Sequence, residues 1–435
     1  MKKKRRVATY FIASIIIIPF FLQNHRNYPN IHFLCEKIYS IFCTNLTLKS
    51  KKKEKHAVVS GQSTTGMVAA AILAKSGYYV DTYDIRNKYT RNIQWAARQS
   101  LVDELASIDT KLEKIFLEKV ARPLYRGSIH INLDGIRREK KHDSVRQGNP
   151  SKLPKNGVEM MAYPSVVNME ARVFETLLRA YLQSLPNVQC HWEGIKLKRR
   201  GDSYAVEGIG VPDLIVIAEG ANSKTRNFLG IRSLPMSQSR MQMSGAIGID
   251  SGGVMIKHRR YERGPFIMLT GVMGRKGSGK TWIVADIDPS KLKNQEEIND
   301  EFRRLAAASL DLSTENIKNL EIFGSIDGMP IALFPLQQTI SDAATAGDNI
   351  IFIGDAVGIG HWSVGGGMQI GAVCHAERLK ILLLDIDSGM AKKEALQKYS
   401  EGVLSDTKAW GEAGLRDFYP TVQNLMDGDA VYDSH

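Results

Sequence analysis

IIFIGDAVGIGHWSVGGGMQIGAVCHAERL, residues 350–379, reads as a buried strand, a glycine-rich turn and the start of a helix. The apolar run that begins at Ile350 suits a strand inside a sheet, and Gly354 and Asp355 end it. Five glycines follow before helical spacing of apolar residues begins near Met368. Glycines ahead of a helix let a ligand approach the backbone, where the first amides are unpaired donors. The stretch therefore predicts a site for a phosphate or another electron-rich group.

A second pattern, near residue 60, has the order of a Rossmann unit. An apolar strand is followed by GQSTTG (residues 61–66), by a helix of small residues, and by a second strand, YYVDTYD, that ends at Asp84. Gly61 suits the tight turn and Gly66 the close packing of helix on sheet, while Ser63 replaces the usual second glycine. We expect a diphosphate on the helix amides and a ribose hydroxyl on Asp84.

A third pattern lies between the other two. The buried strand DLIVIAEG, residues 213–220, ends in Glu219 and Gly220 and is followed by ANSKTR, which ends at Arg226. Each of the three patterns has an acid or a glycine at the end of a buried strand, and the three in this order are far more specific than any one of them.

Together these patterns resemble the FAD-dependent aromatic hydroxylases, the class A flavin monooxygenases, with some likeness to the monooxygenase domain of the MICAL proteins. Residues 350–379 resemble the GD motif, with Trp362 in place of the usual proline and Gln369 in place of asparagine. Residues 213–226 resemble the DG motif, with Glu219 in place of aspartate. The resemblance implies that Asp355 holds a ribityl hydroxyl and that the turn before Gln369 faces the flavin ring.

The resemblance also implies a set of FAD-contacting residues. An Arg-Asn pair of the MICAL type matches Arg91 and Asn92, although a solvated basic loop is the alternative there. The expected cofactor residues are Gly61, Ser63, Gly66, Asp84, Arg86, Arg91, Asn92, Arg98, Arg172, Glu219, Gly220, Gly354, Asp355, Gly365, Gly366, Gly367 and Met368. The sequence assigns no catalytic residue, because the flavin carries the chemistry. His361 and Trp362 are expected to shape the site.

The implied fold is α/β. A Rossmann-like FAD-binding domain of the para-hydroxybenzoate hydroxylase type is interleaved with a mostly antiparallel substrate domain. The expected segments are a basic N-terminal segment (1–55), the FAD-binding unit in two parts (56–165 and 166–235), the antiparallel substrate domain (236–340), and the GD motif with C-terminal helices (341–435).

The substrate domain is expected to contain the strand-like residues 240–287. Within it, GRKGSGKT (residues 274–281) satisfies the P-loop pattern. A P-loop needs a helix directly afterwards, and the following TWIVADI is β-branched and strand-like. We therefore interpret the glycine-rich stretch as a hairpin turn.

The net charge of +12 is concentrated at the N-terminus. Residues 1–55 hold 12 Lys and Arg against 2 acids, so the body is nearly neutral and a nucleic-acid partner is not expected. Residues 7–22 are apolar behind a basic start, which predicts a signal or a membrane anchor with a cytoplasmic body. Four cysteines without CxxC or metal spacing predict buried thiols and no metal.

The function that follows is oxidation by flavin. The resemblance implies FAD, NAD(P)H as the electron donor, and O2 as the source of one oxygen atom for hydroxylation or epoxidation of a small organic substrate. One alternative is an FAD-dependent reductase of an isoprenoid or lipid-like substrate. Another is a degenerate fold without catalysis, suggested by Ser63 and Glu219.

Overall fold

The structure is a computed structural model. It describes residues 55–123, 129–133, 136–139, 165–250, 256–263, 266–274, 277–287, 292, 294–310, 312–328, 331–361 and 366–418. The predicted anchor at residues 7–22, together with Trp362 and Gly365, lies outside these ranges. Within them, no helix is both long and apolar enough to cross a membrane.

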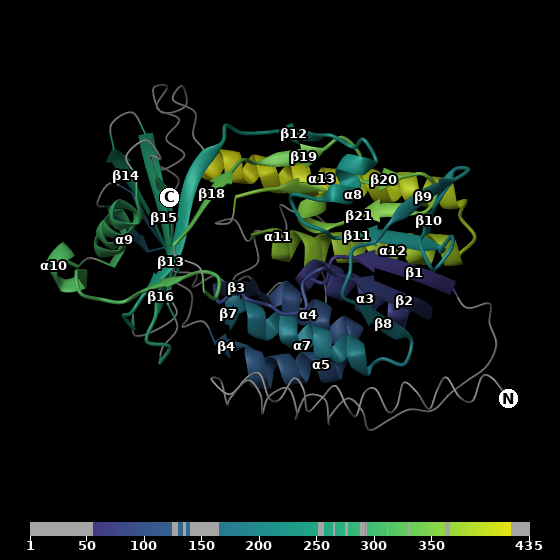
Figure 1. Cartoon of the computed structure of the whole chain (residues 1–435), viewed down its shortest axis with the longest axis horizontal. Coiled ribbons are helices and arrows are strands. Elements are labelled where there is room, and N and C mark those ends of the chain that lie inside the picture. The colour runs from purple at the N-terminus through teal and green to yellow at the C-terminus, as the bar shows by residue number, and fades with distance from the viewer. Residues whose placement is uncertain are drawn as a thin grey trace. The chain divides into compact units, whose positions relative to one another are not determined.

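A six-stranded, mainly parallel sheet carries the three sequence patterns (Figure 1). Its order is β20 (Thr345–Ala346), β21 (Ile350–Phe352), β11 (Leu214–Ile217), β1 (Lys55–Ser60), β2 (Tyr78–Tyr83) and β8 (Val188–His191). All neighbours are parallel except β20 and β21. The central strands β11 and β21 are wholly buried, as their continuous apolar sequences require in a sheet covered on both faces.

Helices surround this sheet. They are α3 (Thr64–Lys75), α4 (Gln99–Ile108), α5 (Thr110–Ile115), the π-helical η1 (Phe116–Val120), α7 (Ala171–Ser184), α8 (Lys224–Phe228), the short η3 (Gly354–Ala356), α11 (Gly366–Gln369), the π-helical η5 (Ile370–His375), α12 (Ala376–Asp387) and α13 (Lys392–Phe418). Helix α3 connects β1 to β2 and is buried along almost its whole length, because its small side chains let it pack closely on the strands.

A second sheet is almost entirely antiparallel. Its strands are β17 (Ile322–Gly324), β13 (Arg240–Ile247), β16 (Thr281–Ile287), β15 (Phe266–Gly274), β14 (Ile256–Arg263), β5 (Ile129–Leu133) and β6 (Ile136–Glu139), with β18 (Ala332–Leu336) also on β13. Among the described strands of this second sheet, only β14 and β5 pair in parallel. Helices α9 (Gln295–Leu310) and α10 (Thr314–Ile317) accompany it, and Phe302 and Leu305 of α9 pack with Met243 and Ile283 of the sheet.

The glycine-rich stretch before β16 is a hairpin connection, as predicted. Strand β15 ends at Gly274, strand β16 begins at Thr281, and the two pair antiparallel. Gly277 and Gly279 both have positive φ, which suits a turn. Since no helix follows, the geometry of a P-loop is not present here.

Smaller sheets complete the fold. Strands β9 (Leu197–Arg200) and β10 (Ser203–Val206) form a hairpin. Strands β12 (Ser233–Pro235), β19 (Thr339–Ser341) and β22 (Gly358–Ile359) form one three-stranded sheet, and β3 (Gln94–Arg98), β7 (Ser165–Glu170) and β4 (Arg122–Pro123) form another.

A single β-bridge joins the segment between β2 and β3 to the segment after β17. Arg91 pairs with Ile326, Asn92 N donates to Ser325 O at 3.1 Å, and Asp327 N donates to Thr90 O at 2.9 Å. The segment that carries Arg91 is therefore held by backbone contacts from the end of the antiparallel sheet.

The spacing of apolar residues predicts helices over residues 100–117 and 168–185 and C-terminal helices over residues 391–416, and several of these boundaries were wrong. The helix expected over residues 168–185 begins at Ala171, because residues 168–170 pair in β7 instead. The helix expected over residues 100–117 breaks at Asp109, whose backbone is extended and whose side chain caps α5 by accepting from Lys111 N. The C-terminal helices expected over residues 391–416 are one helix, α13.

Candidate functional site

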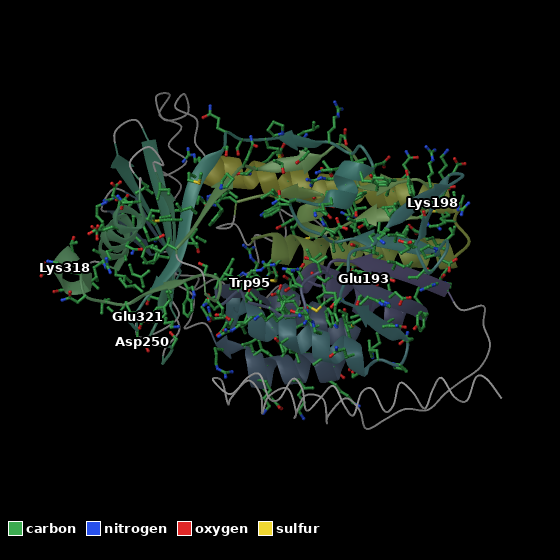
Figure 2. All side chains as sticks on the ribbon, viewed as in Figure 1. Trp95, Glu193, Lys198, Asp250, Lys318 and Glu321 are labelled. Carbon is green, nitrogen blue, oxygen red and sulfur yellow. The ribbon has the colours of Figure 1, made fainter. Side chains whose placement is uncertain are left out.

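A cavity of about 430 Å³ opens at the carboxyl ends of the parallel strands. Its wall includes residues at or just past the ends of four strands: Ser60 of β1 and Gly61 after it, Tyr83 of β2 and Asp84 after it, Ala218 and Glu219 after β11, and Ile353 and Asp355 after β21. This edge is where open α/β sheets bind ligands, and the volume suits a small-molecule site. Trp95 and Glu193, labelled in Figure 2, also line the cavity.

Most of the predicted cofactor residues meet at this cavity. Those that line it are Gly61, Ser63, Asp84, Arg86, Arg91, Glu219, Gly220, Asp355, Gly367 and Met368. Gly66, Asn92, Arg98, Arg172, Gly354 and Gly366 do not line it, and Gly365 lies outside the described residues. Three sequence patterns separated by more than a hundred residues each therefore converge on one place.

The turn between β1 and α3 depends on its two glycines. Gly61 has a φ of 105°, and a Cβ atom there would lie 2.3 Å from Ala218 O. A Cβ atom on Gly66 would lie 1.9 Å from Gly61 O. Because neither glycine carries a Cβ atom, the first turn of α3, with Ser63 and Thr64, can form part of the cavity wall. The unpaired amides of that turn are a ready anion site.

Asp84 is already occupied by donors from the chain. Its Oδ1 accepts from Arg86 N at 2.8 Å and Arg86 Nε at 3.0 Å, and its Oδ2 accepts from Gln62 N and Arg86 Nη2, both at 2.8 Å. Although burial acts to raise it, the pKa of Asp84 lies below its ordinary value because these donors favour the carboxylate. The predicted contact of Asp84 with a ribose hydroxyl would therefore compete with Arg86 for the same carboxylate.

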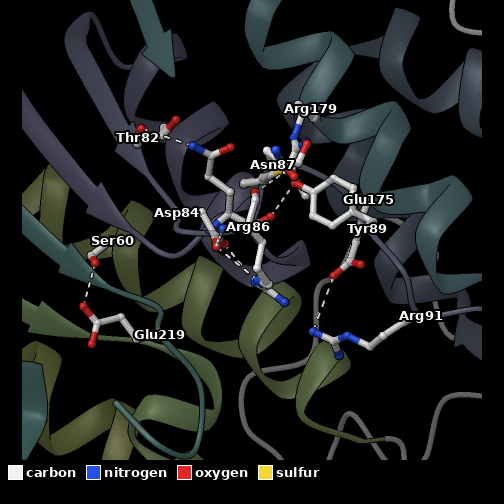
Figure 3. Close-up of polar contacts among 12 residues, drawn as sticks. Ser60, Thr82, Asp84, Arg86, Asn87, Tyr89, Arg91, Glu175, Arg179 and Glu219 are labelled. Atoms are coloured by element: carbon white, nitrogen blue, oxygen red, sulfur yellow. Dashed lines mark hydrogen bonds and ion pairs between the residues drawn. The ribbon is translucent and has the colours of Figure 1, made fainter. Parts of the chain in front are cut away.

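Glu219 is likewise satisfied within the fold. Its carboxylate accepts from Ser60 Oγ and Thr225 Oγ1 at 2.6 Å, from Ser223 Oγ at 2.8 Å and from Thr225 N at 3.0 Å. These bonds tie the end of β1 to the start of α8. Figure 3 shows the one between Ser60 and Glu219. Arg226, one residue further along α8, donates to Ala356 O at 3.2 Å and so links the DG-like segment to the GD-like turn.

Asp355 lies against the start of α11. A Cβ atom on Gly367 would lie 1.7 Å from Asp355 Oδ1, so glycine is required for this approach. Burial raises the pKa of Asp355 to about 6, against the opposing charge of Arg91.

Behind this turn, Gly354 N donates to His375 Nδ1 at 2.9 Å, and His375 Nε2 lies 3.1 Å from Thr407 Oγ1. Burial lowers the pKa of His375 to about 3, so the ring is neutral and accepts the Gly354 amide. Gly354 thus positions the Asp355 turn without lining the cavity.

The segment between β2 and β3 is fixed by Arg179 of α7. Its guanidinium lies 3.9 Å from the ring centre of Tyr89 and 4.4 Å from that of Trp192. It also donates to Tyr89 Oη at 3.0 Å and to Asn87 O at 2.8 Å (Figure 3). Tyr89 in turn donates to Gln62 O at 2.6 Å, so the segment is joined to the turn after β1.

Three predicted arginine and asparagine contacts lie elsewhere. Arg172 pairs with Glu170 and, at 2.7 Å, with Asp327, and Asn92 Nδ2 donates to Asp327 Oδ1 at 3.3 Å. These two residues reinforce the β-bridge instead of lining the cavity. Arg98 is 8% exposed, and burial lowers its pKa to about 10. His361, expected to shape the site, is fully buried and does not line the cavity.

Glu175 is a cavity residue that the sequence did not reveal. It lies on the buried face of α7, and its Oε1 is 3.8 Å from Arg91 Nη2. The available signal was an acid between Phe174 and Leu178, both on the apolar face of an amphipathic helix. Nothing local indicates that this acid faces a ligand site.

The cavity fits FAD in its main features. The first turn of α3 offers amides for a diphosphate, and Thr64 Oγ1 is buried there without a hydrogen-bond partner among the described residues. The glycine at 367 leaves room beside Asp355. Among the acids that line the cavity, Glu175 lies beside the Thr64 amide of that turn, where its charge opposes a diphosphate.

No protein-family model and no curated protein sequence matches the chain. Solved structures do match its fold. The p-nitrophenol 4-monooxygenase PnpA from Pseudomonas putida has 16% identity and a TM-score of 0.60 over 87% of this chain and 94% of its own. PqsL from Pseudomonas aeruginosa, a probable FAD-dependent monooxygenase, has 16% identity and a TM-score of 0.61 over 88% of this chain and 100% of its own. The flavin-dependent monooxygenase PieE, solved with FAD and substrate, has 13% identity and a TM-score of 0.64 over 87% of this chain and 66% of its own.

Proposed function

We propose that this chain, which has the fold of the FAD-dependent monooxygenases, is itself an FAD-dependent monooxygenase. The observation that carries the proposal is the convergence of the Gly61, Glu219 and Asp355 segments on one cavity at the carboxyl ends of a parallel sheet. The finer fold assignment belongs to the same proposal. The parallel sheet is the Rossmann-like FAD-binding part, and the antiparallel sheet forms the substrate side.

Each cavity wall suits one part of FAD. The amides of Ser63 and Thr64 suit the diphosphate, because they stand at the N-terminal end of the buried helix α3, where it meets the cavity. Asp355 is placed to accept from a ribityl hydroxyl, and Gly367 and Met368 are placed beside the flavin ring. The substrate would be a small organic molecule, and NAD(P)H the electron donor.

The reduced flavin, when bound, supplies the electrons that activate O2 for transfer of one oxygen atom. The chain binds, orients and shields. Arg179 and Tyr89 fix the segment that presents Arg91, and Arg91 lies between Glu175 and the charge of Asp355. Trp95, Ile353 and Met368 supply an apolar part of the cavity wall that would help to keep water from the reacting atoms.

The first test is the visible spectrum of the protein, followed by its reaction with NADPH and NADH. We expect flavin absorbance that is released as FAD on heating, then pyridine-nucleotide oxidation with O2 consumption once a substrate is found. A protein that cannot be reconstituted with FAD would overturn the proposal and favour the degenerate fold. FAD reduction without any O2 consumption would favour the reductase alternative.

A further inference from the structure

Glu175 occupies an unusual position for an acid. Its side chain is 1% exposed, and neither carboxylate oxygen makes a hydrogen bond of ordinary geometry within the described part of the chain. It nevertheless forms part of the cavity wall, and Figure 3 shows its carboxylate directed toward Arg91. A buried carboxylate whose nearest cation is 3.8 Å away, without a hydrogen bond of ordinary geometry, costs folding free energy.

The position coincides with the anion site of α3. Ser63, Thr64 and Thr65 of the first turn line the same cavity, and the N-cap Ser63 makes no side-chain cap. The backbone amide of Thr64 acts on Glu175 to favour its ionised form. The carboxylate therefore stands at the positive end of the helix, where a phosphate is expected to bind.

Glu175 is surrounded by three arginines and few other titratable groups of the described chain. Burial raises its pKa, and the cations that oppose this are Arg91 and Arg86 from the segment after β2 and Arg179 from its own helix. Tyr89 is the other titratable group beside it, and Asp355 of η3 shares the charge of Arg91. From α3 it meets the Thr64 amide.

We propose that Glu175 takes up a proton when the diphosphate of FAD enters the cavity, so that cofactor binding is coupled to protonation of this side chain. The inference rests on the proposed function. The incoming phosphates compete with Glu175 for Arg91 and for the amides of α3. Once these are drawn to the phosphates, the buried carboxylate loses its nearest counter-charge, because Arg86 pairs with Asp84 and Arg179 contacts Tyr89. A proton from solvent then neutralises it. The neutral acid then donates a hydrogen bond to a phosphate oxygen.

The direct test is calorimetric titration of the flavin-free full chain with FAD, at one pH, in two buffers of different ionisation enthalpy. About pH 8 is suitable, because Asp355, with a pKa of about 6, is already ionised there. We expect uptake approaching one proton per FAD. Linkage then requires the affinity to weaken toward about tenfold per pH unit as the pH rises. Binding of FAD without proton uptake would overturn the inference and leave the proposed function standing.

Two variants identify the group. Glu175→Gln keeps the shape but cannot titrate, so it should bind FAD without proton uptake and with an affinity independent of pH. Glu104→Gln is the matched control. Glu104 is also a buried acid whose pKa is raised by burial, but it pairs with Lys380 at 2.7 Å and does not line the cavity. It should retain the uptake. Equal uptake in Glu175→Gln and wild type would overturn the assignment.

Should Glu175→Gln fail to fold, the wild type alone still tests the inference, through the number of protons taken up per FAD and the pH dependence of its FAD affinity. Absence of FAD binding by the wild type would instead overturn the proposed function on which the inference rests.

Discussion

Asp355 lies against the first turn of α11, where burial raises the pKa of its carboxyl group to about 6. The folded protein therefore binds this proton more tightly than the unfolded chain does. The contribution of this proton to the free energy of unfolding is fully present at low pH. It is lost as the pH rises from the pKa of Asp355 in the unfolded chain through its pKa in the folded protein. At neutral pH the ionised Asp355 thus lowers the stability of the flavin-free protein.

Asp355→Asn separates these two effects. Because asparagine does not titrate, the variant should gain up to about 3 kcal/mol over the flavin-free wild type when the pH changes from about 4 to 8. It should also bind FAD roughly 10- to 100-fold more weakly, since it loses a charged acceptor. Denaturant unfolding at both pH values and FAD titration measure the two quantities. The exposed Asp348→Asn is the control, and equal pH dependence in wild type and Asp355→Asn would contradict the prediction.

At the scale of elements, the turn between β1 and α3 determines whether the cavity forms. Gly66→Ala places a Cβ atom 1.9 Å from Gly61 O, and the backbone must shift to relieve it. We expect a loss of about 1–3 kcal/mol in the free energy of unfolding, together with a larger loss of FAD affinity. Thermal denaturation and FAD titration check the two effects.

Gly194→Ala is the matched control for that turn. Gly194 also lines the cavity, but a Cβ atom there meets only Ile85 Cγ2, at 3.7 Å. It should retain stability. Equal damage from both substitutions would show that the close packing of α3 on the turn is not what matters.

The elements also show how far the sequence alone could lead. The strands of the three sequence patterns, the glycine turns and the hairpin before β16 follow from local patterns, and these were predicted. The state of Glu219 was not, because Ser60 Oγ comes from a strand 159 positions earlier. The break of the helix at Asp109 was missed because a capping aspartate and an aspartate in mid-helix look alike in sequence. Site residues that bind each other, as Asp84 and Arg86 do, were predicted as ligand contacts.

Across the whole molecule, the β-bridge between Arg91 and Ile326 connects the cavity segment to the antiparallel sheet. Arg172, Asn92 and Asp327 reinforce it with side-chain contacts. Asp327 is partly exposed, so its ion pair with Arg172 contributes little to stability by itself. Its larger effect is on local order.

Asp327→Ala tests that effect. We expect at most about 1 kcal/mol of destabilisation. We also expect faster hydrogen exchange in peptides that cover residues 90–92 and 325–327 together, because both strands of the bridge open at once. Peptides from β1 should be unchanged. Asp300→Ala, which removes the exposed pair with Arg303 on α9, should leave both regions as they are. Faster exchange in only one of the two peptides would contradict a shared bridge.

Trp95 on the cavity wall gives the protein an optical reporter of its own. A flavin absorbs in the range where indole emits, so a flavin beside Trp95 should quench this emission by energy transfer. Arrival and departure of the cofactor can thus be followed in real time, without a label, from the fluorescence of the chain.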